Sequence, residues 1–395
     1  MKQLRSIENR NLQGKKVFLR LDLNVPLKDG KITDSTRIDA ALPTIKYLLD
    51  QNCRVVMCSH LGRPKGERKP ELSLEPVGED LANKLGVEVV FIDEYFDNPY
   101  QPVLNQLSSG QIMLLENLRF YKEETSNDDK FSQTLAEGID FYINDAFGTC
   151  HRAHASTEGV AKQLPEDKRA AGFLVAKEIN ALSSLSHAKA PFSVVMGGSK
   201  VSDKLGVILS VIEKCNHLLI GGAMAYTFLK YNGISVGSSR VEDDKLDLVK
   251  KIYDNAARRN VQIHLPVDHI AGAEFSADTT PVVTDSANIS EGLMGLDIGP
   301  KTIENYRSVL ASSKTILWNG PMGVFEWSAF SKGSLAIADE MAKNEGTTII
   351  GGGDSVAATN LAGVSEKMTH VSTGGGASLE FLEGKALPGI RVLMA

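Results

Sequence analysis

The sequence predicts an α/β protein made of two doubly wound, Rossmann-like domains with parallel sheets. Short apolar segments alternate with helix-like segments along the whole chain, which is typical of parallel strands covered by helices. The chain has 395 residues, too many for a single ordinary hydrophobic core. Several apolar segments also run directly into glycine clusters, as strands do at the ligand-binding edge of such sheets.

The first half of the chain predicts strands that are separated by helices. The expected strands are 17–21, 54–59, 87–92, 112–116 and 141–145. The helical spacing of apolar residues predicts helices over 37–49 and 74–85. Because parallel strands end at the same edge of a sheet, we expect the residues that follow them to converge on one crevice.

The second half continues the same alternation. The expected strands are 192–196, 217–220, 262–266, 281–284, 315–318, 348–350 and 369–372. The expected helices are 203–213, 243–258, 302–311 and 332–344. This order again predicts a parallel sheet with helices on its faces.

A single helix over 170–185 is predicted at the boundary between the domains. Apolar residues recur there near helical spacing, and Lys189-Ala190-Pro191 ends the pattern before the next strand. We therefore expect a first domain over 1–170, a helical hinge over 171–187 and a second domain over 188–385. A helix is a stiff connection, so the two domains are expected to move as bodies about it.

The composition excludes several classes of protein. Hydrophobic residues make up 42% and charged residues 23% of the chain, as in globular proteins. No apolar run reaches the roughly 18 residues of a membrane span, and the first residues lack the apolar core of a signal peptide. The four cysteines form no CxxC pair, which favours free thiols in a reducing compartment. With a net charge of −6, these features predict a cytoplasmic protein without a nucleic-acid or membrane partner.

Glycine clusters follow four of the apolar strand segments in the second half. They lie at 197–198, 221–222, 351–353 and 374–376. A strand that opens through glycines into a helix exposes backbone N–H groups at the helix N-terminus, where phosphate groups bind. A lysine beside the first cluster and an aspartate beside the third strengthen the prediction of a nucleotide-phosphate site.

Charged side chains follow the predicted strands of the first half. Most arginines of the chain precede residue 185, and arginine suits bidentate recognition of carboxylate and phosphate. The basic residues expected around a small, strongly anionic ligand are Arg37, His60, Arg63, Arg119 and Arg152. Asp22 and Asn24 are expected to bond a hydroxyl of the same ligand. For any single arginine a solvated surface position is the favoured interpretation, whereas the group of five at strand ends favours ligand binding. His151 and His154 are compatible with structural roles.

Two lysines and an aspartate are the candidate phosphate contacts of the second half. Lys200 directly follows the first glycine turn, and Lys204 lies four residues further on, so both are expected to face the same way at a helix start. The segment is not GxxxxGK[ST], so it is no Walker P-loop. Asp354 suits either a Mg²⁺ contact or a helix N-cap, and Ser355 also suits the cap.

Two further residues are candidates for the rest of a nucleotide. Glu326 ends the segment Trp318–Glu326 and either accepts a ribose hydroxyl or is a solvated loop acid. Asp297-Ile298-Gly299-Pro300 has the pattern of a cap followed by a helix start, and Gly295 before it is a candidate to line a base pocket.

Taken together, these segments resemble the phosphoglycerate kinase family closely. The matching stretches occur in the family's order and span nearly the whole chain. They are RLDLNVP (20–26), HLGRP (60–64), LLENLRF (114–120), DAFGTCHRAHAST (145–157), GGSKVSDKL (197–205), WNGPMGVFE (318–326), GGGDS (351–355) and STGGGASLEFLEGKALPG (372–389).

The resemblance implies a monomer with a cleft between its two domains that catalyses 1,3-bisphosphoglycerate + ADP ⇌ 3-phosphoglycerate + ATP, with Mg²⁺. Matching positions imply that phosphoglycerate is held by Asp22, Asn24, Arg37, His60, Arg63, Arg119 and Arg152. They imply that the nucleotide is held by Lys200, Lys204, Gly295, Glu326, Gly352, Gly353, Asp354 and Ser355, with Asp354 near the metal. The residues after about 385 are expected to return and pack on the first domain.

The predicted residues fit this chemistry. In the ATP-consuming direction the nucleophile is a carboxylate, which is already ionised at pH 7, so no general base is needed. The remaining tasks are charge neutralisation and positioning. Arg37, Lys200, Mg²⁺ and the N–H groups of the turn around Gly375 are expected to perform them.

Two alternatives from other classes are open at this point. A nicotinamide dehydrogenase requires GxGxxG after a strand and an acidic residue about 20 residues later, whereas the glycine turns here are GG or GGG without that spacing. A non-enzymatic anion-binding protein would not need Lys200, Asp354 and Glu326 in one half and the arginines in the other. Turnover and MgADP binding distinguish these classes.

Overall fold

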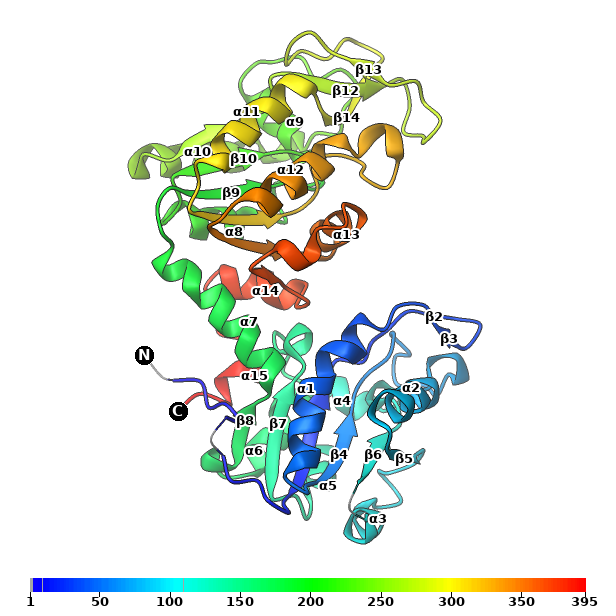
Figure 1. Cartoon of the computed structure of the whole chain (residues 1–395). Helices are drawn as coiled ribbons and strands as arrows, with labels where there is room; N and C mark the ends of the chain where they lie inside the picture. The colour runs from blue at the N-terminus through cyan, green and yellow to red at the C-terminus, as the bar shows by residue number, and fades with distance from the viewer. Residues whose placement is uncertain (1–2, 9, 109) are drawn as a thin grey trace. The chain divides into compact units, whose positions relative to one another are not determined.

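The computed structural model describes residues 3–8, 10–108 and 110–395, and the chain divides into two compact units (Figure 1). Unit 1 comprises Met1–Asn180 and Ala386–Ala395, and unit 2 comprises Ala181–Lys385. The first two residues of the expected first domain lie outside the described residues. Within the described ranges, no helix combines the length and the apolar character needed to cross a membrane.

Unit 1 contains a six-stranded parallel sheet in the order β5-β6-β4-β1-β7-β8. Its strands are β1 (Lys16–Leu21), β4 (Arg54–Cys58), β5 (Glu88–Ile92), β6 (Gln111–Leu115), β7 (Phe141–Asp145) and β8 (Arg169–Ala171). Strand β1 is central, and the chain winds from it in both directions, so the sheet is doubly wound. The order reverses between β1 and β7, and ligands bind beyond the carboxyl ends of strands at such a switch point.

The helices of unit 1 bury their apolar faces on this sheet. The longer ones are α1 (Thr36–Asp50), α2 (Glu75–Leu85) and α5 (Asp129–Ala136). The shorter ones are α3 (Gln101–Gln106), α4 (Lys122–Ser126), α6 (Val160–Gln163) and α15 (Pro388–Arg391), and a hairpin is formed by β2 (Leu27–Lys28) and β3 (Lys31–Ile32). Ile38 and Ile45 of α1 share one buried cluster with Val55 of β4 and Leu81 of α2. This burial keeps the strand ends of unit 1 in place.

Unit 2 contains a second six-stranded parallel sheet in the order β11-β10-β9-β15-β16-β17. Its strands are β9 (Phe192–Met196), β10 (His217–Ile220), β11 (Gln262–His264), β15 (Thr315–Asn319), β16 (Thr347–Gly351) and β17 (His370–Val371). The switch point lies between β9 and β15. The predicted α/β class with two doubly wound parallel sheets is therefore confirmed.

The helices of unit 2 follow its strands, as in unit 1. They are α8 (Leu205–Ile212), α9 (Met224–Tyr231), α10 (Leu246–Arg259), α11 (Pro300–Ala311), α12 (Lys332–Lys343), α13 (Gly353–Leu361) and α14 (Gly376–Leu382). Trp318 of β15 is fully buried in a cluster with Tyr306 of α11 and Ile337 of α12. This cluster supports the carboxyl ends of β15 and β16.

The helix predicted over 170–185 begins later than expected. Residues 170 and 171 belong to strand β8, and α7 spans Phe173–Ser184. The reason lies in Asp145 at the end of β7, which accepts the N–H of Val175 at 3.1 Å. The carboxylate thus serves an N–H group of the first turn of α7, and because a Cβ atom at Gly172 would lie 2.3 Å from it, glycine is required at 172.

The cap and helix start expected at Asp297-Ile298-Gly299-Pro300 is confirmed for Gly299 and Pro300, the N-cap and first residue of α11, whereas Asp297 and Ile298 end strand β14 (Met294–Ile298). Helix α11 begins at Pro300, and Asp268 supplies the carboxylate that accepts the N–H groups of Lys301 and Thr302. Strand β14 pairs with β12 (His269–Gly272), which also pairs with β13 (Val282–Val283). Of this antiparallel sheet, the sequence indicated only the segment around β13.

The C-terminal residues of the chain contact unit 1. The N–H of Arg5 donates to the carbonyl of Leu393 at 3.0 Å, and the N–H of Gly389 donates to the carbonyl of Cys150 at 2.9 Å. Arg391 also forms an ion pair with Glu158 at 3.0 Å. These contacts assign residues 386–395 to unit 1 although unit 2 precedes them in the sequence.

Candidate functional site

The loops that follow β1 and β4 are tied together by predicted site residues in unit 1. The side-chain oxygen of Asn24 accepts the N–H of Gly62 at 2.8 Å, which joins the loop after β1 to the loop after β4. Asp22 is largely buried and accepts a hydrogen bond from the guanidinium of Arg37 on α1 at 2.5 Å. The loops and α1 therefore form one preorganised surface at the carboxyl edge of the sheet.

His60 lies at the centre of a positively charged cluster in unit 1. Its side chain is 4% exposed, and burial lowers its pKa well below the usual value. Arg20, Arg119, Arg37 and His154 act on it in the same direction by charge repulsion. Three guanidinium groups around a neutral imidazole give this part of unit 1 an excess of positive charge. Such an excess suits an anionic ligand.

Arg119 carries a free donor in this cluster. One of its terminal nitrogens donates to the carbonyl of Gly62 at 2.9 Å. Its Nε is buried and has no hydrogen-bond partner in the part of the chain that the structure describes. Burial, with a smaller contribution from Arg20, lowers the pKa of Arg119 to about 10. Buried donors normally have a hydrogen-bond acceptor. This nitrogen is therefore a candidate donor to a bound anion.

Arg20 is a functional residue that the sequence analysis missed. It is fully buried in β1 and donates to Ser156 Oγ at 2.8 Å, and its Nη2 lies 3.2 Å from His60 Nδ1. Because a guanidinium has only donors, Nδ1 of His60 accepts, and the imidazole proton is on Nε2. A charged residue inside an otherwise apolar strand was the signal that could have revealed it.

A buried carboxylate completes this network. Ser156 donates its hydroxyl and its N–H to the two carboxylate oxygens of Glu124, at 2.6 and 2.9 Å. Glu124 is fully buried, and its two oxygens both accept hydrogen bonds from Ser156. Through Ser156 this carboxylate is linked to the guanidinium group of Arg20. The chain Glu124–Ser156–Arg20 holds the His60 ring in one orientation and one tautomer.

The remaining basic residues of unit 1 are more peripheral. Arg63 and Arg152 are exposed, and Arg152 Nε donates to His151 Nε2 at 3.1 Å. His154 is buried, and its backbone N–H donates to Thr157 Oγ1 at 3.1 Å, in agreement with a structural role. The structure thus brings together Asp22, Asn24, Arg37, His60 and Arg119, while Arg63 and Arg152 stand at the edge of the group.

A pocket of about 220 Å³ in unit 2 gathers many of the predicted nucleotide residues. It is lined by Lys204, Gly320, Gly352, Gly353, Asp354, Ser355, Gly375, Gly376 and Leu379. Helices α13 and α14 begin at this pocket, with Gly352 and Gly375 as their N-caps. The first N–H groups of a helix lack intrahelical partners and carry partial positive charge, so the pocket suits phosphate oxygens.

Only two of the four glycine clusters line this pocket. The prediction that each cluster presents free N–H groups to phosphate is wrong for the other two. The N–H groups of Gly197 and Gly198 donate to the carbonyls of Asn319 and Pro321, both at 3.0 Å. Those of Gly221 and Gly222 donate to the carbonyls of Met196 and Met322. A Cβ atom at Gly197 would lie 2.0 Å from the carbonyl oxygen of Pro321. These glycines permit close packing of the loops and do not present free N–H groups.

The two candidate lysines differ in position. Helix α8 begins at Leu205, so Lys200 and Lys204 both precede it and are not aligned by helical spacing as predicted. Lys204 lines the pocket and donates to the side-chain oxygen of Asn319. Burial lowers the pKa of Lys204 to about 8, and the carboxylate of Asp354 opposes this effect. Lys200 is partly exposed and does not line the pocket.

Asp354 lines the phosphate pocket and is not the N-cap of its helix. Gly352 is the N-cap of α13, and Asp354 is an exposed residue of the first turn that lines the pocket. Ser355 is buried, and its hydroxyl accepts the N–H of Gly320 at 2.5 Å. Within the described residues, no group of three or more His, Cys, Asp or Glu could hold a metal. One carboxylate beside a phosphate site fits Mg²⁺, which takes most of its ligands from phosphate and water.

Gly295 and Glu326 do not line this pocket. Gly295 lies in β14, where a Cβ atom would be 2.0 Å from the hydroxyl oxygen of buried Tyr226. Glu326 is exposed in the loop that follows β15. The close approach of Tyr226 explains why glycine is required at 295. A base pocket lined by Gly295 stays a prediction.

Comparison with known proteins gives a consistent result. Residues 7–385 match the family model described as phosphoglycerate kinase. The chain is 52% identical over 392 residues to the phosphoglycerate kinase of Clostridium novyi (strain NT), covering 98% of both chains. It is 51% identical over 393 residues to that of Clostridioides difficile (strain 630), again covering 98% of both.

Solved structures of the same kind are similar in fold. The phosphoglycerate kinase of Coxiella burnetii has a TM-score of 0.90 and 42% identity, with 99% of each chain covered. That of Pyrococcus horikoshii OT3 has a TM-score of 0.84 and 33% identity, with 99% of this chain and 98% of the other covered.

Proposed function

The chain belongs to the phosphoglycerate kinase family, and from this premise we propose which of its residues carry out the family's reaction. The enzyme transfers a phosphoryl group between 1,3-bisphosphoglycerate and ADP, and its products are 3-phosphoglycerate and ATP. The observation that carries the residue assignment is the presence of a different anion site in each unit. A monomeric state and a cytoplasmic location stay predictions from the sequence.

Unit 1 holds the phosphoglycerate in this proposal. Arg37 is paired with Asp22, whereas the buried Nε of Arg119 has no hydrogen-bond partner among the described residues and is a donor for the ligand. Asp22 and Asn24 lie beside the cluster and bond the hydroxyl of the ligand. Arg63 and Arg152 are exposed at its edge and add long-range attraction for the phosphate.

Unit 2 holds the nucleotide phosphates at the beginnings of α13 and α14. Lys204 binds the outer phosphates, and Asp354 contacts Mg²⁺ directly or through water. When bound, the cation neutralises phosphate oxygens next to the transferring group. Gly352, Gly353 and Ser355 shape the turn, and Gly295 and Glu326 contact the nucleoside.

The chemistry needs stabilisation of charge rather than proton transfer. The acceptor carboxylate of 3-phosphoglycerate is ionised at neutral pH, so the site needs no general base. Arg37, Lys200 and the N–H groups of the turn at Gly375 stabilise the charge on the transferring group. Lys200 acts mainly on this group and contributes little to the affinity for ADP.

Phosphoryl transfer from MgATP to 3-phosphoglycerate tests the proposal. Coupling the acyl phosphate to a dehydrogenase lets NADH loss report turnover, and reactions without Mg²⁺ or without 3-phosphoglycerate are the controls. The expected result is turnover that depends on both. Absence of turnover with both substrates bound would contradict the assigned chemistry.

The substitution Lys200→Met separates catalysis from binding. Turnover is expected to fall by about 10²- to 10³-fold, the usual loss for one charge-stabilising donor, while the affinity for ADP stays within a factor of a few. Lys204→Met is the matched control, because Lys204 lines the phosphate pocket and its loss weakens ADP binding. A parallel loss of ADP affinity and turnover in Lys200→Met would contradict the role given to Lys200.

A further inference from the structure

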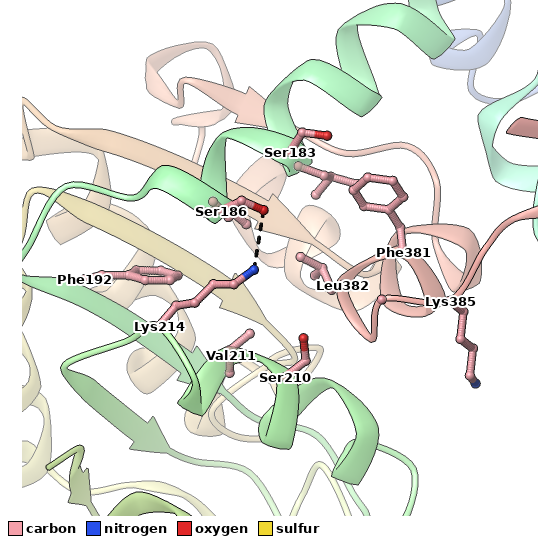
Figure 2. Close-up of a pocket in the computed structure, with 12 residues that line it drawn as sticks. Ser183, Ser186, Phe192, Ser210, Val211, Lys214, Phe381, Leu382 and Lys385 are labelled. Atoms are coloured by element: carbon pink, nitrogen blue, oxygen red, sulfur yellow. Dashed lines mark hydrogen bonds between the residues drawn. The ribbon is translucent and has the colours of Figure 1, made fainter. Parts of the chain in front are cut away.

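A second cavity of unit 2 lies apart from the phosphate pocket and has a volume of about 310 Å³. It is enclosed by the segment 182–186, by α8 and by the end of α14 (Figure 2). None of the residues assigned to substrates above lines it. Its volume is at the lower end of the range for small-molecule sites, roughly 300 to 1,000 Å³.

About half of the cavity lining is apolar. Its buried or half-buried apolar side chains are Leu182, Leu185, Phe192, Val211, Phe381 and Leu382. An apolar group that enters such a cavity gains roughly 25 cal/mol for each Å² of surface removed from water. The walls therefore favour a ligand with an apolar body.

The polar lining of the cavity is positive. Serine hydroxyls and two lysines line it, and no aspartate or glutamate does. Lys385 is paired with Glu383 at 2.6 Å and points away from the other residues drawn in Figure 2. Lys214 instead reaches toward Ser186, whose hydroxyl oxygen lies 3.4 Å from its ammonium nitrogen. No carboxylate among the described residues pairs with Lys214 within ion-pair distance, so its charge is available to a ligand.

We propose that this cavity binds a small monocarboxylate with an apolar body and that this ligand regulates nucleotide binding. The carboxylate pairs with Lys214 and accepts a bond from a serine hydroxyl at the rim. The apolar body lies between Phe192 and Leu382. Charge and apolar surface are thus both complementary, whereas a purely polar anion would leave the apolar walls uncovered.

Helix α14 connects this cavity to the phosphate pocket. Gly376 and Leu379 of α14 line the phosphate pocket, and Phe381 and Leu382 of the same helix line the second cavity. A helix of seven residues moves as a unit, so a ligand at one end shifts the N–H groups at the other. Such coupling is reciprocal: each ligand changes the affinity for the other by the same factor.

Calorimetric titration of the full chain with decanoate tests the site, with 1-decanol as the uncharged probe of the same shape. We expect saturable binding of decanoate that is about tenfold tighter than that of decanol, as one charge-assisted bond allows. Lys214→Met is expected to abolish this preference, and Ser210→Phe, which fills the cavity from a half-exposed position, is expected to abolish binding of both. Lys250→Met is the matched control, because Lys250 is exposed on α10 and paired with Asp254, and it should bind decanoate like the unchanged protein.

Titration of ADP with and without saturating decanoate tests the connection through α14. Saturating decanoate should change the dissociation constant of ADP. Saturating ADP should change the dissociation constant of decanoate by the same factor. Lys214→Met and Ser210→Phe should keep the unchanged protein's turnover without decanoate, which shows that they are folded. Absence of saturable binding, or binding that neither variant alters, would contradict the site. Equal ADP affinities with and without decanoate would contradict the regulation.

Discussion

In unit 1 the candidate anion site is lined by charged side chains, whereas in unit 2 the pocket is lined mainly by glycines and helix starts. The guanidinium groups of Arg20, Arg37 and Arg119 contribute the positive charge in unit 1, and the buried imidazole of His60 lies among them. In unit 2, Lys204 is the lysine that lines the pocket, together with the carboxylate of Asp354. The same kind of ligand group is therefore met by full charges in one unit and by peptide dipoles in the other.

The two sites are therefore expected to tolerate different changes. A site of buried side-chain charges loses much when one charge is removed, because the rest of the network is left unbalanced. A site of backbone N–H groups depends on how closely the ligand can approach the chain, so an added methyl group matters more there.

Removal of Arg37 should have the largest effect. Arg37 bonds Asp22 and faces the charged cluster, so Arg37→Ala is expected to lower kcat/KM for 3-phosphoglycerate by about 10³-fold, or roughly 4 kcal/mol. Both kcat and KM should change, because the guanidinium acts on the bound and on the reacting substrate. Steady-state kinetics at varied 3-phosphoglycerate measure the two constants.

Arg63→Ala is the matched control for this measurement. Arg63 is an exposed arginine at the edge of the same cluster, so its loss should raise KM and leave kcat within a factor of a few. Equal falls in kcat for the two variants would show that the half-exposed Arg37 and the exposed Arg63 do not differ in role.

Adding one methyl group to a glycine turn should separate the packed turns of unit 2 from the open ones. A Cβ at Gly197 would lie 2.0 Å from the carbonyl oxygen of Pro321, so Gly197→Ala should lower the free energy of unfolding by about 3 kcal/mol. At Gly353 a Cβ would have no atom within 4 Å. Gly353→Ala should therefore change stability by less than about 0.5 kcal/mol and weaken ADP binding by about tenfold. Urea unfolding and calorimetry measure both; equal destabilisation would contradict the division into packed and open turns.

The positive cluster of unit 1 should make that unit sensitive to acid. Burial lowers the pKa of His154 to about 4, and Arg119 and Arg20 act in the same direction. Below about pH 6.5 the unfolded chain binds a proton at this imidazole, whereas the folded protein binds it only near pH 4. This contribution to stability is therefore complete above pH 6.5 and is lost as the pH falls to 4, by up to about 3 kcal/mol.

Hydrogen exchange of the buried β1 amides reports the stability of unit 1 as a function of pH. His154→Gln should show a shallower fall in protection between pH 6.5 and 4 than the unchanged protein. Identical slopes in the two proteins would mean that His154 does not remain neutral in the folded state.

The smallest predicted effect concerns Lys204 in unit 2. Its pKa is lowered to about 8 by burial, so the ammonium loses its proton at mildly alkaline pH. The affinity for ADP should fall by about tenfold between pH 7.5 and 9.5, the worth of one charge-assisted bond. Lys204→Arg should keep its affinity over this range, and Lys204→Met should bind weakly at every pH. The same decline in all three proteins would place the titrating group elsewhere.

Much of the fold could be predicted because parallel strands are buried on both faces. Strands β9 and β10 have the bounds that the apolar segments predicted, and both are followed by glycines. Only β13 of the antiparallel sheet was predicted, because β12 (His269–Gly272) and β14 (Met294–Ile298) each contain a glycine and lack a clear apolar pattern. The start of α7 escaped because it depends on the carboxylate of Asp145, which the fold brings next to Gly172.

The candidate site was predictable to a similar degree. Residues at strand ends, such as Asn24 and His60, were found because the topology of the sheet brings those ends together. Arg20 was not found, because its partner Ser156 lies 136 residues away in the sequence. The glycine clusters looked alike in sequence, and only the carbonyls that approach Gly197 and Gly221 distinguish packed turns from open ones. Such partners are determined by tertiary structure and leave no local pattern.

Hydrogen exchange of the full chain with one ligand at a time distinguishes the two kinds of anion site. With 3-phosphoglycerate alone, protection should rise in the segments 21–26, 59–63 and 117–121 of unit 1. With MgADP alone, it should rise at 352–356 and 374–378 of unit 2. Two separate footprints would agree with one anion site built from side chains and another built from backbone, whereas protection of the same unit by both ligands would contradict the account.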